Sequence, residues 1–355
     1  MKSKLFPFIY IFCILVIFLS CSNKPKRERK PVSTITLSPN QKNYTFGEQV
    51  DIQVKTRLRD GEIEKIELYH ENNLLATEKS LDFTYRLKAI SKLGPNLLKV
   101  VATKTDKLEN TRYKTFSALS DITPEVNQFE LVNEYPHSTE YFTQGLEVNN
   151  GFLYESTGQE GTSAIHKITF QTGNVISKVN LYKQYFGEGI TILGNNIYQL
   201  TYKSKKGFVY NLSDFTLTDS FRITSVEGWG LTNDGKHLIM SDGTDRLTWI
   251  NPENYSVIKS LYVATDKMHI KGLNELEFVN GSIFANVWTE NYIIKINPEN
   301  GKVISITDLS ELYSHFIAET PIDVLNGIAY IESSGNFLVT GKFWPILFEI
   351  KLLSE

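Results

Sequence analysis

Cysteine is almost absent from this chain of 355 residues. The two cysteines, Cys13 and Cys21, both lie within the first 21 residues. The rest of the sequence therefore excludes a cysteine nucleophile, a disulfide framework and a zinc site with cysteine ligands. The six histidines are scattered, and none forms the i, i+4 pair of a helical zinc motif. We therefore predict no metal-dependent active site.

A strong charge of one sign is also lacking. The chain has 37 Lys and Arg residues against 40 Asp and Glu residues, which gives a formal net charge of -3. This balance argues against nucleic acid as a partner. The length exceeds one domain of roughly 100–200 residues and favours two domains. Aromatic residues make up 12% of the chain while methionine occurs only 3 times, a composition that favours β-structure.

No hydrophobic run is long enough to cross a membrane. The apolar segment 5–19 is shorter than the ~20 residues that a spanning helix needs. Lys2 and Lys4 precede this segment, and Ser20 and Cys21 follow it, which is the pattern of an export signal over residues 1–20.

Residues 18–21 resemble a bacterial lipoprotein box, in which Cys21 is lipidated after cleavage. This predicts an exported lipoprotein, periplasmic or at the cell surface, that contacts the membrane only through its lipid anchor. A plain secretory signal with an incidental Cys21 is the alternative. Residues 21–32 are polar and proline-flanked, and we expect a solvated tether there.

Residues 33–120 contain short segments in which apolar and polar residues alternate, separated by turn residues. Val50, Ile52 and Val54 form one such segment, and Asp60-Gly61 is one of the turns. This spacing predicts an immunoglobulin-like β-sandwich. It contains no catalytic constellation, so we expect a spacer or docking module, with a linker over about 117–125.

The remainder, about 126–355, contains five copies of a strand–turn–strand unit. Aligned on Leu146, Ile190, Leu231, Leu276 and Ile328, the copies recur at intervals typical of propeller blades of about 40–50 residues. The fifth copy lacks an outer strand, and residues 129–135 have no other partner. Pairing 129–135 with 346–352 would close the ring and remove an exposed edge. The sequence thus predicts an all-β chain, a five-bladed propeller preceded by the sandwich.

Two repeat positions are expected to meet at one mouth of the propeller channel. The first strands bring Gln144, Glu188, Trp229, Asn274 and Asn326 there, and the returning strands bring Gly158, Tyr202, Gly243, Trp288 and Lys342. Phe142 and Phe186 stand two residues ahead of Gln144 and Glu188. An aromatic wall with one acid, one base and several amides is the composition of a ligand pocket.

Nine segments in register resemble the plant- and bacterial-type glutaminyl-peptide cyclotransferases. They are FTQGL (142–146), LYESTG (153–158), FGEGIT (186–191), EGWGLT (227–232), SDG (241–243), LNELE (273–277), ANVW (285–288), LNGIA (325–329) and VTGK (339–342). The resemblance covers about 130–350 and implies a five-bladed propeller unrelated to the zinc-dependent animal enzymes.

The resemblance also implies the activity and the residues of the site. N-terminal glutamine of peptides or proteins would cyclise to pyroglutamate with release of ammonia, and no cofactor would be needed. Glu188, Asn274 and Lys342 match the family's catalytic positions. The substrate-pocket residues would be Phe142, Gln144, Phe186, Trp229 and Trp288, together with Asn326 and Tyr202. Tyr202 stands where the family usually has tryptophan.

The chemistry suggests a role for each polar group. Glu188 would move a proton from the α-amine to the leaving nitrogen. Lys342 and Asn274 would orient the amide and stabilise the oxyanion. Two alternatives remain at this stage: a non-catalytic surface propeller that binds peptide or glycan, and a different propeller enzyme such as a lactonase.

Overall fold

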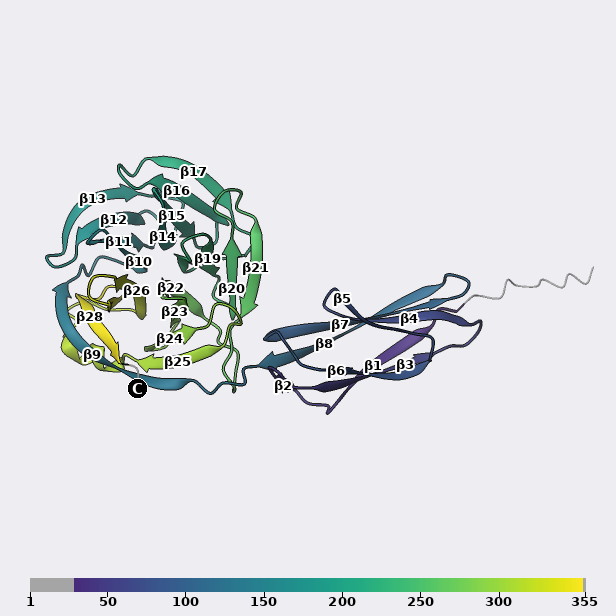
Figure 1. Ribbon diagram of the computed structural model, residues 1–355. Helices are drawn as coiled ribbons and strands as arrows, with labels where there is room; N and C mark the ends of the chain where they lie inside the picture. The colour runs from purple at the N-terminus through teal and green to yellow at the C-terminus, as the bar shows by residue number, and fades with distance from the viewer. Residues whose placement is uncertain (1–28, 354–355) are drawn as a thin grey trace, which may run out of the picture.

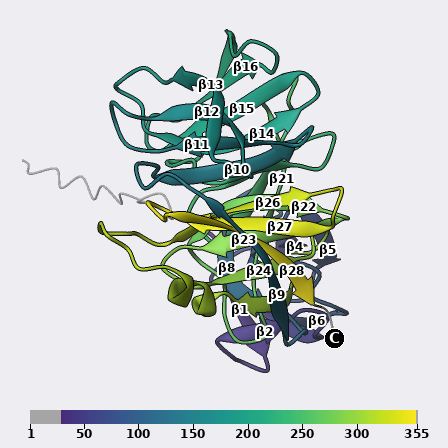
Figure 2. The ribbon, with the colours of Figure 1, turned by 90° about the vertical axis from the view of Figure 1, so that its left-hand side faces the viewer.

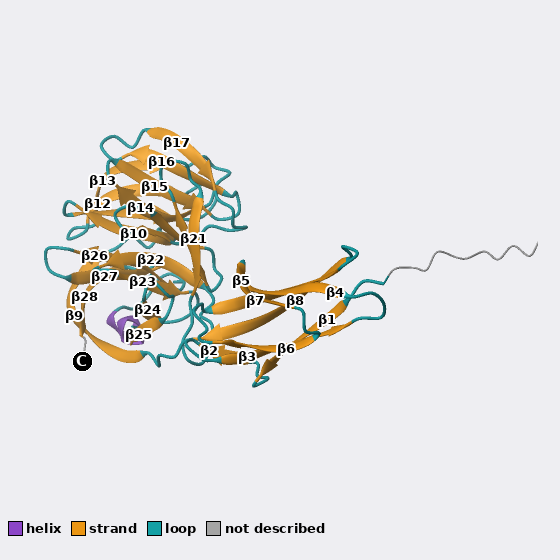
Figure 3. Ribbon diagram, turned by 45° about the vertical axis from the view of Figure 1, so that its right-hand side comes forward, coloured by secondary structure: helices purple, strands orange, loops and turns teal. Residues whose placement is uncertain are grey.

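The computed structural model describes residues 29–353. The predicted signal peptide 1–20, Cys21 and most of the predicted tether lie outside the described residues. Nearly all regular structure is β-strand, and the one helix of the described chain is the short 3-10 helix η1 (Ser310–His315), coloured purple in Figure 3. This confirms the all-β fold class. Over residues 29–353 no helix has the length and apolarity to cross a membrane.

The N-terminal part consists of two facing sheets (Figure 1). The first has the order β1-β3-β6 and is made of β1 (Val32–Ser38), β3 (Val50–Arg57) and β6 (Asp82–Leu87). The second has the order β2-β8-β7-β4-β5 and is made of β2 (Asn43–Thr45), β8 (Glu109–Leu119), β7 (Gly94–Lys104), β4 (Ile63–His70) and β5 (Asn73–Glu78). Alternate side chains of both sheets, such as Ile52 and Leu68, fill one shared core, as in a β-sandwich.

The C-terminal part forms five four-stranded blades around a central axis (Figure 1). Blade one is β10 (Thr143–Asn149), β11 (Phe152–Thr157), β12 (Ala164–Thr169) and β13 (Asn174–Asn180); blade two is β14 (Gly187–Leu193), β15 (Asn196–Thr201), β16 (Lys206–Asn211) and β17 (Leu217–Arg222). Blade three is β18 (Leu231–Asn233), β19 (Leu238–Ser241), β20 (Arg246–Ile250) and β21 (Val257–Tyr262). Blade four is β22 (Leu273–Val279), β23 (Ser282–Val287), β24 (Tyr292–Ile296) and β25 (Val303–Asp308); blade five is β26 (Leu325–Ile331), β27 (Asn336–Gly341), β28 (Ile346–Leu353) and β9 (Glu125–Pro136). The strands β10, β14, β18, β22 and β26 contact one another in a ring around the axis.

Blade five is completed by the strand that precedes blade one. β9 pairs antiparallel with β28, with Phe129 opposite Leu352 and Tyr135 opposite Leu347 (Figure 2). This confirms the predicted closure of the ring. The first residues of β9 also pair parallel with β25, where Val126 lies opposite Ile306. The closing strand therefore joins blades four and five into one eight-stranded sheet, and no strand edge is left open between them.

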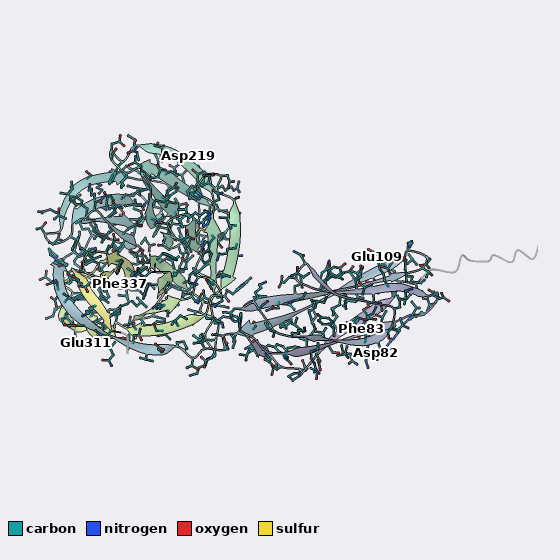
Figure 4. The ribbon with its side chains drawn as sticks, in the orientation of Figure 1. Asp82, Phe83, Glu109, Asp219, Glu311 and Phe337 are labelled. Atoms are coloured by element: carbon teal, nitrogen blue, oxygen red, sulfur yellow. The ribbon has the colours of Figure 1, made fainter. Side chains whose placement is uncertain are left out.

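The two domains are joined more tightly than a flexible linker would allow. β8 continues to Leu119 and β9 begins at Glu125, so the connection is shorter than the predicted 117–125. The backbone N–H of Ser120 donates to the Thr265 carbonyl at 3.0 Å. The side chains of Leu93 and Leu119 pack on Ala264 of the propeller. The opposite end of the sandwich, marked by Glu109, lies away from the propeller (Figure 4).

Candidate functional site

A cavity of about 290 Å³ opens at one mouth of the propeller channel. It is lined by Phe142, Gln144, Phe186, Glu188, Tyr202, Trp229, Asn274, Trp288 and Lys342. The structure thus brings together nine of the ten residues predicted for the site, and they come from all five blades. The volume is at the lower end of the range for small-molecule pockets, which suits a ligand the size of one amino-acid residue.

Irregularities in the innermost strands aim the polar residues at this mouth. The antiparallel register shifts between Thr143 and Gly145, so Gln144 lies in a bulge. The same shift encloses Glu188 in β14 and Asn274 in β22. A bulge breaks the alternation of side chains and redirects one of them. The repeated bulge therefore explains why Gln144, Glu188 and Asn274 line the cavity although they lie within buried strands.

The returning strands are held at the same mouth by a repeated backbone hydrogen bond. Tyr202 N–H donates to the Phe186 carbonyl at 3.1 Å, Trp288 N–H to Gly272 at 2.8 Å and Lys342 N–H to Val324 at 3.0 Å. In blade one Gly158 N–H donates to Phe142 at 2.8 Å. Each bond ties the end of a second strand to the residue two positions ahead of the bulge.

The two polar residues at the centre of the site are anchored through their backbones. Ser156 Oγ donates to the carbonyl of Glu188, and Ser241 Oγ donates to the carbonyl of Asn274 at 2.7 Å. Both serines stand in the blade before the residue they hold. The sequence analysis missed Ser156 and Ser241, although both lie in the segments that carry the resemblance.

Two of the returning positions are glycines, and the reason is space. A Cβ on Gly158 would lie 2.4 Å from a ring carbon of Phe186 and 3.0 Å from Cγ of Gln144. A Cβ on Gly243 would lie 2.7 Å from the Trp229 ring. Gly158 and Gly243 therefore do not line the cavity but leave room for the aromatic rings that do.

The aromatic residues form two walls. Phe142 and Phe186 meet edge to face at 5.9 Å, and Phe186 lies 5.6 Å from the Tyr202 ring. On the other side Trp229 and Trp288 meet edge to face at 5.9 Å. Trp288 is 51% exposed, whereas the polar residues at the base of the cavity are almost fully buried. The site therefore has a buried base and an open rim at Trp288.

Glu188 and Lys342 are the charged groups at the base, 3% and 5% exposed. Burial raises the pKa of the Glu188 carboxyl well above its ordinary range, with Lys342 opposing the rise and Glu227 adding to it. Burial lowers the pKa of Lys342, against the attraction of Glu188. Within residues 29–353 the Glu188 carboxyl makes no side-chain hydrogen bond, and the buried Oδ1 of Asn274 has no partner. These groups are free to bind a ligand.

Glu227 was not predicted as a site residue, yet it shapes the site electrostatically. Its carboxylate accepts a hydrogen bond from Trp229 Nε1 at 3.0 Å and lies 3.6 Å from Lys203 Nζ. The bond fixes the indole of Trp229 against the cavity. The EGWG segment (227–230) could have predicted this contact, because Glu227 and Trp229 are two residues apart and such residues on an extended chain point to the same side.

Asn326 is the exception among the predicted site residues. It lies at the equivalent bulge of β26 but is fully buried and does not line the cavity. Its Nδ2 donates to the Thr143 carbonyl at 3.0 Å and to Gln144 Oε1 at 3.3 Å. Asn326 therefore supports Gln144 through its Nδ2, while its buried Oδ1 has no partner within residues 29–353. Its contact with a ligand stays a prediction.

The described residues contain no group of three or more His, Cys, Asp or Glu side chains arranged to hold a metal ion.

A family model described as glutamine cyclotransferase matches residues 100–352. The chain belongs to the glutamine cyclotransferase family. Because the family match begins at residue 100, most of the sandwich lies outside it.

Individual relatives agree with this assignment. A glutaminyl-peptide cyclotransferase from Arabidopsis thaliana is 38% identical over 235 residues, which cover 65% of this chain and 73% of that protein. The crystal structure of a Myxococcus xanthus glutaminyl cyclase is 32% identical and matches with a TM-score of 0.61 over 64% of this chain and 98% of that one. Family membership supports glutamine cyclotransferase activity.

Proposed function

We propose that the cavity converts N-terminal glutamine of peptides and proteins to pyroglutamate with release of ammonia. The observation that carries the proposal is the Glu188 carboxyl, which is buried, unpaired and raised in pKa at the base of a cavity the size of one residue. Family membership supports the same reaction class.

The reaction forms one bond and breaks one. The α-amine nitrogen attacks the side-chain amide carbon, a tetrahedral oxyanion forms, and the bond to the side-chain nitrogen then breaks. One proton must leave the amine and one must reach the departing nitrogen. A carboxyl whose pKa is raised by burial accepts a proton more readily than an ordinary carboxylate and can then return it, and we assign both transfers to Glu188.

The neighbours of Glu188 supply orientation and charge. Lys342 Nζ lies 4.5 Å from the centre of the Phe142 ring and makes no ion pair within the described residues, so its N–H groups can donate to the oxyanion. The unpartnered Oδ1 of Asn274 can accept a hydrogen bond from the substrate amide. The aromatic walls hold the side chain curled toward its own amine, and this positioning supplies much of the rate.

The direct test is incubation of the purified protein with a peptide that begins with glutamine. We expect the mass of the peptide to fall by one ammonia, and ammonia to appear in equal amount. Binding of the peptide without a change of mass would contradict the proposal and favour a non-catalytic binding propeller.

We further propose that the chain is exported and lipidated at Cys21, with residues 21–32 as a tether that precedes the immunoglobulin-like sandwich. The basic start, the apolar run and the residues 18–21 support this. Incorporation of a labelled fatty acid, lost on C21S, tests it. Release of unlabelled protein into the medium would favour a plain secretory signal instead.

A further inference from the structure

A second, larger groove lies beside the glutamine cavity. This groove has a volume of about 860 Å³, and Trp229 and Trp288 line both spaces. The opposite wall belongs to the sandwich, which contributes Lys42, Asn43 and Leu119. A further hollow, beside His166 on blade one, shares no lining residue with the cavity. The two shared indoles therefore make the groove between the domains our candidate path for the part of a substrate that extends beyond the cavity.

The floor of the groove is the loop between β21 and β22. Lys267, Met268 and Lys271 of this loop line the groove, and Met268 is 60% exposed. The sandwich and the connection after it hold the loop in place. Ser117 Oγ of β8 lies 2.8 Å from His269 Nε2, and Thr123 Oγ1 of the connection donates to Asp266 at 2.7 Å.

The same loop ends at the glutamine cavity. Gly272 accepts the backbone hydrogen bond of Trp288 and donates its own N–H to Gly243 at 2.9 Å, beneath Trp229. Contacts from the sandwich thus continue, through one short loop, to both indoles of the rim.

The charges of the groove are unbalanced. Lys42, Lys267 and Lys271 are exposed and line it, and within residues 29–353 none of them forms an ion pair. Glu290 is the opposing carboxylate, and His269 is held by Ser117 and lies 3.5 Å from Asp245. An apolar strip of Trp288 and Met268 flanked by free lysines suits an extended chain that carries carboxylates.

Resting on the proposed function, we propose that this groove binds the residues that follow the N-terminal glutamine, and that it selects polypeptides with acidic residues in the first few positions after it. An extended chain advances about 3.3–3.6 Å per residue, so a few residues beyond Trp288 reach the lysines. The sandwich is then part of the substrate site.

The test compares three peptides that begin Gln-Ala and continue with acidic, neutral amide or basic residues. An exposed ion pair changes affinity by roughly two- to fivefold. We expect kcat/KM for the acidic peptide to exceed that for the neutral one by about five- to tenfold at low salt, with the basic peptide poorest. The difference should lie in KM and shrink in 0.5 M salt, on the order of the screening expected for exposed charges.

Charge reversals assign the effect to the groove. K42E in the sandwich and K267E in the loop should each lower kcat/KM for the acidic peptide by about threefold or more and raise it for the basic peptide. K236E, in the exposed β18–β19 turn, is the matched control and should change neither. Equal rates for the three peptides, or an equal loss in K236E, would overturn the proposal.

A dipeptide, Gln-Ala, separates this inference from the proposed function. It fills the cavity but is too short for the lysines, so its turnover should be the same in all three variants. Turnover of the dipeptide without any preference among the longer peptides would disprove only the groove. Absence of turnover with every substrate would disprove the proposed function itself.

Discussion

The Glu188 carboxyl of blade two and the Lys342 ammonium of blade five line one cavity, and each opposes the pKa shift that burial imposes on the other. Within residues 29–353 Glu188 and Lys342 do not form an ion pair with each other. In the proposed reaction, the substrate amide would bind between a proton carrier, Glu188, and a hydrogen-bond donor, Lys342. This relationship underlies the first two predictions below.

Replacing Glu188 by glutamine should abolish most of the turnover. The variant keeps the shape of the side chain but cannot carry a proton, so we expect kcat to fall at least about 100-fold with little change in KM. The measurement is steady-state kinetics with a Gln-initiated peptide. E160Q, an exposed glutamate of blade one, is the control and should behave as the parent. Near-normal turnover by E188Q would remove the role assigned to this carboxyl.

Two neighbours should move the acidic limb of the pH–rate profile in opposite directions. Lys342 lowers the pKa of Glu188, so K342M should shift that limb to higher pH as well as lowering kcat. Glu227 raises the pKa of Glu188, so E227Q should shift the limb to lower pH while its amide oxygen still accepts from Trp229. Shifts of the same sign in both variants would contradict this electrostatic arrangement.

Removing the indole at the open rim should weaken binding more than chemistry. Trp288 is half exposed and lies against Trp229, away from the polar base. W288A should therefore raise KM for Gln-initiated peptides about tenfold or more, with a smaller change in kcat, because aromatic packing of this kind is worth about 1 kcal/mol beyond its buried area. W288F should recover most of the loss. A pure kcat effect would place Trp288 in the chemistry instead.

Two buried glutamates near the channel, Glu275 and Glu277, and the partly buried Glu147 should make stability depend on pH. Burial and mutual repulsion raise the pKa of Glu275 and Glu277 well above the ordinary range, and burial raises the pKa of Glu147 to about 7. Each is bonded to a backbone N–H of another blade, as Glu277 is to Tyr330 at 2.9 Å. The folded state holds these protons more tightly than the unfolded state. The contribution of these three groups to the free energy of unfolding is therefore fully present below about pH 4.5, and it is lost as pH rises toward 7.

The E277Q variant tests this dependence. Glutamine mimics the protonated acid and keeps an acceptor for Tyr330, so the melting temperature should rise at pH 8 and change little at pH 4. Thermal unfolding followed at both pH values measures it, with E299Q, on an exposed turn, as the control. A lower melting temperature at pH 8 would show that the charged form stabilises the channel.

The repeat made the fold and most of the site predictable. Five copies of one hairpin must present equivalent positions to the axis, so aligning Leu146 with Ile190 and their counterparts placed Glu188, Asn274 and Lys342 at one mouth. The closure of the ring followed from a missing strand in blade five and an unpaired strand at 129–135. Both inferences rest on the repeated strand pattern, because the pattern shows where a unit is complete and where one strand is missing.

Other features depended on contacts between distant segments. Asn326 occupies a predicted position but turns to Thr143 and Gln144, because its buried amide finds acceptors in blade one. The serines that hold Glu188 and Asn274 come from neighbouring blades, and the pKa of Glu188 depends on Glu227 of blade three. Side-chain direction at a bulge and the electrostatics of a cavity are set by packing across the ring, which no single segment encodes.

The amino-acid sequence alone determined the number of blades, the closing strand and the identity of the residues around the channel mouth, since periodic patterns specify elements and their repetition. Tertiary structure decided which of those residues reach the cavity, how far burial shifts their protonation, and that the sandwich shares a groove with the propeller. The physical reason is that desolvation and domain contacts arise only when segments far apart in the chain exclude water together.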